Sequence, residues 1–74
     1  MANEFIQQGY LALQRGDKRA ARHWAELALA QDSTLEDPWL LLAAVSTPRA
    51  SVEFLQRALL FNPQSERAQK GLQW

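Results

Sequence analysis

The chain has 74 residues, and its eight basic and eight acidic residues give a formal net charge of zero. A chain of this length forms one small domain, here residues 1–74, and buries only about 60% of its unfolded surface. It contains no cysteine, which excludes disulfides and favours a reducing cytoplasm. The longest apolar run, residues 38–45, is less than half of the roughly 20 residues that a membrane-spanning helix needs, so we expect no membrane partner.

Helix-forming residues dominate, and no segment alternates apolar and polar residues as strands do. The pattern predicts helices over about residues 3–15 and 18–31, a third that has Pro38 in its first turn and ends near residue 46, a fourth over 48–61 and a shorter fifth over 65–73. Typical end and start signals separate them, such as Gly16-Asp17, Thr47-Pro48 and Asn62-Pro63. We therefore predict an all-α fold of five helices with antiparallel neighbours and short loops.

Two segments of the chain, thirty residues apart, resemble each other. Residues 21–34 read ARHWAELALAQDST, and residues 51–64 read SVEFLQRALLFNPQ. The shift pairs the aromatic Trp24 with Phe54, and it continues through the next link and helix, where Leu42 pairs with Leu72. A match of this length predicts an internal repeat: one hairpin over about residues 3–32, a second over 35–62, and a capping helix over 65–73.

The repeat resembles the tetratricopeptide repeat family. Gly9, Gly16-Asp17, Ala21, Ala28 and Asp32 stand in the family's order and spacing, with Phe5 where the family prefers Trp; Trp39 and Leu42 match its first-helix aromatic and leucine, and Pro63 its closing proline. The resemblance implies a short right-handed array of hairpins. The spacing departs from the usual unit of about 34 residues, because the segment Ser46-Thr47-Pro48 replaces a longer turn. A generic helical bundle is the alternative fold.

The resemblance assigns a core and a groove. The signature core would consist of Gly9, Ala21, Trp24, Ala28, Trp39, Leu42, Leu55, Ala58 and Pro63, and Val52 would also face inward. In the family, the first helices of the hairpins line a concave groove that binds helices or extended peptides. The groove positions here would be Ile6, Tyr10, Leu13, Leu40, Leu41 and Ala44. One groove type in the family clamps a C-terminal carboxylate with Lys, Asn and Arg, but only Arg67 offers a suitable charge here. We therefore expect an apolar groove rather than a carboxylate clamp.

The expected function is a non-enzymatic module that binds a protein or peptide. The first alternative is self-association, because an open apolar row seldom stays exposed on a monomer; a homodimer would cover residues 38–45. The second alternative is RNA binding, which a local basic cluster beside Trp24 suggests. That cluster comprises Arg15, Lys18, Arg19 and Arg22. The zero net charge argues against nucleic acid.

The sequence offers no catalytic constellation. His23 is the only histidine and has no cysteine to share a metal with, so we expect no metal site. The carboxylate pairs Asp17 with Glu26 and Glu36 with Asp37 are better explained by helix capping, by the first helical turn or by a solvated face. Phosphate loops, Ser-His-Asp sets and nucleophile motifs are missing from the sequence. We expect neither enzymatic activity nor a cofactor.

Overall fold

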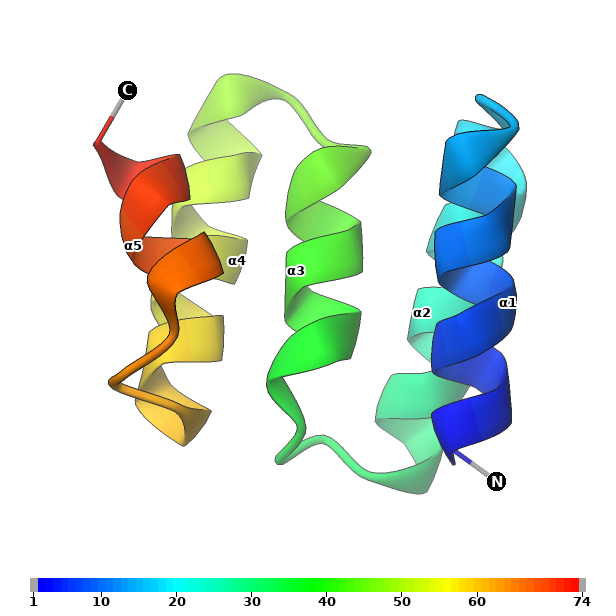
Figure 1. The fold of residues 1–74 in the computed structure, drawn as a ribbon, viewed down its shortest axis with the longest axis horizontal. Coiled ribbons are helices and arrows are strands. Elements are labelled where there is room, and N and C mark those ends of the chain that lie inside the picture. Colours follow the sequence, from blue (N-terminus) through cyan, green and yellow to red (C-terminus); the bar gives the residue numbers. More distant parts are fainter. Residues whose placement is uncertain (1, 74) are drawn as a thin grey trace.

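The computed structural model describes residues 2–73. They form five helices, as the sequence predicts: α1 (Ala2–Gln14), α2 (Lys18–Gln31), α3 (Glu36–Ala44), α4 (Pro48–Phe61) and α5 (Glu66–Leu72). No strand occurs in this part of the chain. The helices alternate in direction, so that sequence neighbours are antiparallel, with α1, α3 and α5 in one layer and α2 and α4 behind them (Figure 1).

The helix starts that the sequence predicts are confirmed. The side-chain oxygens of Asp17, Thr47 and Ser65 each accept a hydrogen bond from the backbone N–H three residues later, at 3.0, 3.3 and 3.2 Å. These bonds satisfy donors that the first turn of a helix cannot use internally. Gly16, which ends α1, has a φ of 78°, a conformation that residues with a Cβ rarely adopt.

The first hairpin packs through small side chains. Ala21, Ala25 and Ala28 of α2 are completely buried. Gly9 of α1 leaves room for α3: a Cβ built on Gly9 would lie 2.6 Å from Cδ1 of Leu41. The close approach of these helices therefore depends on residues with little or no side chain.

Each hairpin carries a stacked aromatic pair. Phe5 and Trp24 stack between α1 and α2 with ring centroids 5.8 Å apart. Trp39 and Phe54 stack between α3 and α4 at 6.2 Å. Ala58, the position equivalent to Ala28 in the thirty-residue shift, is also completely buried. Both hairpins thus contain a stacked aromatic pair and a fully buried alanine.

Three residues differ from the sequence expectation. Leu41 was expected in the groove but is 0% exposed, because its side chain fills the space beside Gly9. Val52 was expected to face inward but is 43% exposed, because Leu55 and Ala58 define the inner side of α4. Pro63 was placed in the core but is exposed: it follows the end of α4 in the turn, where its missing N–H prevents the helix from continuing.

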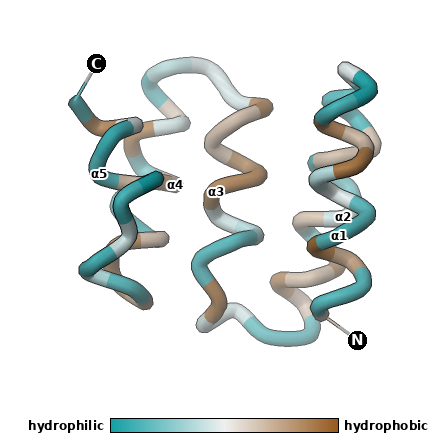
Figure 2. Tube along the Cα trace, viewed as in Figure 1, coloured by the Kyte–Doolittle hydropathy of each residue, from teal (hydrophilic) through white to brown (hydrophobic). Residues whose placement is uncertain are grey.

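The hydrophobic residues are concentrated on α3 and on parts of α1, α2 and α4, whereas α5 is mostly hydrophilic (Figure 2). Within residues 2–73, no helix has both the length and the apolar character needed to cross a membrane.

Candidate binding groove between α1, α3 and α5

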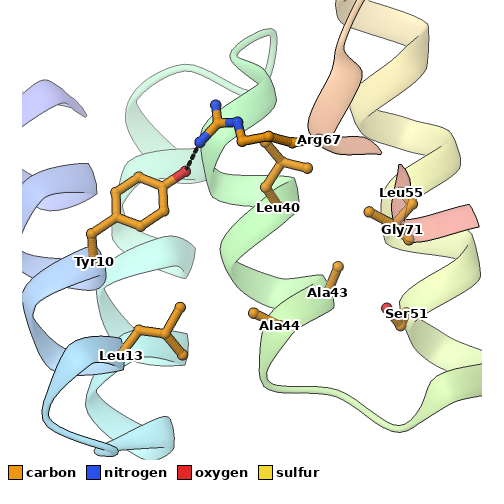
Figure 3. Close-up of a pocket in the computed structure, with 9 residues that line it drawn as sticks. All are labelled: Tyr10, Leu13, Leu40, Ala43, Ala44, Ser51, Leu55, Arg67 and Gly71. Carbon is orange, nitrogen blue, oxygen red and sulfur yellow. Dashed lines mark hydrogen bonds between the residues drawn. The ribbon is translucent and has the colours of Figure 1, made fainter. Parts of the chain in front are cut away.

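An open groove of about 380 Å³ lies on the face formed by α1, α3 and α5 (Figure 3). Its lining comes from four helices and comprises Tyr10, Leu13, Leu40, Ala43, Ala44, Ser51, Leu55, Arg67 and Gly71. Most of these side chains are apolar or small. In Figure 3 the α3 residues Leu40, Ala43 and Ala44 lie between the side chains from α1 and those from α4, and we call these three residues the floor of the groove.

The spacing of residues along α3 explains this floor. Leu40, Ala43 and Ala44 are separated by three and four positions, which places them on one side of a helix. Leu40 is half-buried, Ala43 is buried and Ala44 is exposed. The floor is therefore apolar but largely supported by the core beneath it, and Ala44 is its most accessible point.

A network of three polar side chains stands at one end of the groove. The hydroxyl of Tyr10 donates a hydrogen bond to Oδ1 of Asp37 at 2.6 Å. Arg67 donates from Nη1 to the Tyr10 hydroxyl at 2.9 Å and from Nη2 to Oδ1 of Asp37 at 2.7 Å. The guanidinium also lies over the Tyr10 ring, 5.9 Å from its centroid. We call these three residues the clasp, because they join α1, α3 and α5.

The clasp fixes the charge state of its members. Partial burial, followed by the hydrogen bond to Asp37, raises the pKa of the Tyr10 phenol well above its usual range. Burial works against the charged form of Arg67, but the contacts with Asp37 and Tyr10 outweigh it and raise the pKa of Arg67. At neutral pH the clasp therefore contains a neutral phenol and one ion pair, so it adds no net charge to the groove.

The groove continues toward the connection between α3 and α4. A second hollow of about 320 Å³ shares Ser51, Leu55 and Gly71 with it. At Gly71, an added Cβ would lie 2.7 Å from Cδ1 of Leu55, so the glycine allows α5 to approach α4. The two hollows together form an elongated trough.

Four of the six predicted groove residues line the groove: Tyr10, Leu13, Leu40 and Ala44. Leu41 is in the core, and Ile6, which is half-buried one helical turn before Tyr10, is outside the lining. Five further residues line it: Ala43, Ser51, Leu55, Arg67 and Gly71. From the sequence, Leu55 was expected in the core and Arg67 was the one suitable charge among the family's clamp positions. Ser51 and Leu55 have the four-residue spacing of one helix side, which is a usable signal. Apart from the family resemblance, no pattern in the sequence connects Arg67 with a tyrosine 57 residues away.

The other titratable residues singled out in the sequence have structural partners or are exposed. Asp17 caps α2, and Glu36 accepts a hydrogen bond from Nδ2 of Asn62 at 2.8 Å. His23 is exposed, with its ring edge toward Trp24. In residues 2–73 no three His, Cys, Asp or Glu side chains come together in a way that could hold a metal ion. The groove therefore offers apolar surface beside an ion pair whose two charges cancel.

No family model, curated protein or solved structure matches the chain. The resemblance to tetratricopeptide repeats therefore stays a prediction.

Proposed function

We propose that the chain is a non-enzymatic interaction module that binds a helix or an extended segment of another protein in the groove between α1, α3 and α5. The observation that supports this is the apolar trough itself. Leu13 and Leu40 are only half-buried and Ala44 is exposed at its mouth. Covering one leucine side chain is worth about 1.5–3 kcal/mol, so a partner that fills the trough gains affinity from it.

A peptide fits the chemistry of the trough at both ends. Small residues, among them Ala43, Ser51 and Gly71, leave space for side chains of a partner. At the other end, Arg67 uses two of its five N–H donors within the clasp, and its side chain is 56% exposed. The remaining donors are available to a carbonyl or carboxylate oxygen of the bound segment.

The repeat supports the proposal further. Phe5 and Trp39, the first-helix members of the two stacked pairs, are 34 residues apart, whereas the second-helix members Trp24 and Phe54 are thirty apart. The shorter spacing follows from α3, which has nine residues where α1 has thirteen. The α1–α2 and α3–α4 connections are equally long, at residues 15–17 and 45–47, so the sequence expectation of a shortened turn is wrong. A tetratricopeptide-like relationship is thus part of what we propose, with the first helices of the hairpins forming the binding face.

Burial within α3 favours a separate partner over self-association. The dimer expected from the sequence needs exposed apolar side chains at residues 38–45, yet Pro38 and Leu41 are almost completely buried and Leu42 is 6% exposed. Only Ala44 in this run is exposed. A homodimer through α3 alone would cover little apolar surface, whereas an inserted segment reaches the trough beside it.

The test uses one substitution in the trough and a matched control. Peptides are selected from a displayed library on the wild-type chain, and their affinities are measured for Ala44→Glu and Ala30→Glu. Both alanines are exposed near the ends of helices, but Ala30 lies on α2, outside the groove lining. We expect Ala44→Glu to weaken binding at least about tenfold, because the peptide would bury an unpaired carboxylate. Ala30→Glu should bind as the wild type does.

Two results would contradict the proposal. One is that selection yields no peptide above background. The other is that selected peptides bind Ala44→Glu as tightly as the wild type. Sedimentation of the chain alone, from micromolar to near-millimolar concentration, distinguishes a peptide groove from a surface that a second copy covers.

A further inference from the structure

Although the net charge of the chain is zero, the two opposite ends of the folded molecule carry charge of opposite sign. The α1–α2 and α3–α4 connections lie at one end of the molecule, and the α2–α3 and α4–α5 connections lie at the other (Figure 1). Residues 15–22 and 45–49, at the first end, contain five basic residues and one acidic residue, a net charge of +4. Residues 30–37 and 60–67 together with Glu4, at the opposite end, contain five acidic residues and one basic residue, a net charge of −4.

The positive charges at the first end, which we call the basic end, are accessible. It contains Arg15, Lys18, Arg19, Arg22 and Arg49, and all five are exposed. Among the described residues the one ion pair joins Arg67 to Asp37, so no carboxylate neutralises any member of the basic end. Its single acidic residue, Asp17, is held by the backbone N–H of Ala20 at 3.0 Å.

One member of the basic end, Arg22, is held in place. Arg22 of α2 donates a hydrogen bond from Nη2 to the backbone carbonyl of Val45 at 3.0 Å and a longer one to Oγ of Ser46 at 3.5 Å. These bonds connect the start of α2 to the turn between α3 and α4. Both α2 and α4 begin at this end, but α1, α3 and α5 end there, so the helix macrodipoles offset one another and the positive charge comes from the side chains. A side chain that is already held in place loses little conformational entropy when an anion binds.

We propose that the basic end binds the phosphate backbone of a nucleic acid without reading its sequence. A membrane surface is the less suitable anion, because peripheral binding combines charge with inserted apolar side chains. Of the exposed large apolar residues, Leu60 and Phe61 lie at the opposite end, and Leu11 and Val52 lie about one helical turn from residues 15–22 and 45–49 rather than within them. Trp24 is half-buried and stacked on Phe5, so no base-stacking platform accompanies the charges.

The proposal depends on where the charged residues lie in the folded molecule rather than on the net charge of the chain. Zero net charge was the sequence argument against nucleic acid, but screening confines electrostatic interactions to about 8–10 Å at physiological salt. The molecule is 23 Å across in its second-longest dimension, so the acidic end lies beyond the screening distance from a ligand on the basic end. None of the five basic residues lines the groove or the second hollow, although that hollow reaches Ser46 and Pro48 beside the basic end. The proposal does not depend on the peptide-binding function.

The test measures fluorescence anisotropy of labelled single-stranded and double-stranded DNA, each about 20 nucleotides long, at several salt concentrations. We expect a Kd on the order of 10⁻⁵ M at low salt and a slope of log K against log salt of about −3 for four phosphate contacts on the single strand. Arg19→Glu should weaken binding at least about fivefold and reduce the slope by about one. Arg57→Glu is the matched control, because it makes the same charge change on an exposed residue of α4 outside the basic end.

Circular dichroism confirms that both variants are helical before binding is compared. The proposal is wrong if no DNA binds at low salt, or if Arg57→Glu weakens binding as much as Arg19→Glu does. Binding only to vesicles that contain phosphatidylserine would assign the basic end to a membrane surface and also overturn it. Salt-sensitive self-association without DNA binding would assign it to the acidic end of a second copy, with the same consequence.

Discussion

At the scale of single residues, the clasp is the feature that most affects the groove. Tyr10, Asp37 and Arg67 come from three helices, and each side chain bonds to the other two. Replacing Tyr10 by Phe removes two hydrogen bonds but leaves the Arg67–Asp37 ion pair. We expect this change to lower the free energy of unfolding by about 0.5–1.5 kcal/mol, measured by urea denaturation at neutral pH. An unchanged unfolding midpoint would show that the clasp does not stabilise the fold.

The clasp also predicts how stability depends on pH. The folded environment raises the pKa of Tyr10, whereas an unfolded tyrosine ionises near pH 10. Stability from this residue is therefore complete below about pH 10 and is lost as the pH rises above it, because the unfolded chain then releases a proton that the folded chain retains. Tyr10 is the only tyrosine, so tyrosinate absorbance reports it alone. If the Tyr10 phenol of the folded chain ionised with a midpoint near pH 10, its burial and its hydrogen bond to Asp37 would be contradicted.

Sequence analysis could not find the clasp, and the reason is physical. Arg67 is 57 residues from Tyr10 and 30 from Asp37, and a charged residue on a short helix has no periodic signature. From the sequence alone, the presence of Asp37 in the first turn of α3 is explained by the favourable interaction of an acidic residue with the helix dipole. Its role appears only when α5 is placed beside α3.

At the scale of helices, the equivalence of the hairpins can be tested at the alanine contacts. Ala28 of α2 and Ala58 of α4 are both 0% exposed. Leucine at either position would overpack the hairpin, and we expect a loss of about 1–3 kcal/mol in thermal or chemical unfolding. Ala30→Leu is the matched control, since Ala30 is exposed on α2. Unaltered melting of both Ala28→Leu and Ala58→Leu would refute the structural repeat.

The helices show what local sequence can and cannot determine. Their ends were predictable because Gly16, Thr47 and Ser65 act through their own backbone and side chain within a few residues. The face of α3 was not predictable, because this helix is apolar nearly all round and no polar stripe marks its outer side. The family resemblance assigned Leu41 to the groove, but Gly9 has no side chain and leaves space in the core that Leu41 fills.

At the scale of the molecule, the folded chain of 74 residues has two surfaces of different character, the apolar groove and the basic end. The groove follows from the layer of α1, α3 and α5, and the basic end follows from the alternating direction of the helices (Figure 1). Antiparallel hairpins bring the α1–α2 and α3–α4 connections to one end, where residues 15–22 supply four basic residues and residues 45–49 supply one. Composition alone gives a neutral chain, so the separation of charge is visible only after the chain is folded.

The central claim, that the groove binds a peptide segment, is tested most directly by titrating a selected peptide into isotopically labelled chain and following the backbone amides by NMR. We predict that shifts cluster at the groove lining, with Leu13, Leu40 and Ala44 among the largest, while exposed residues of α2 such as Ala30 stay unchanged. Shifts concentrated on the outer faces of α2 and α4, with the groove lining unaffected, would contradict the account.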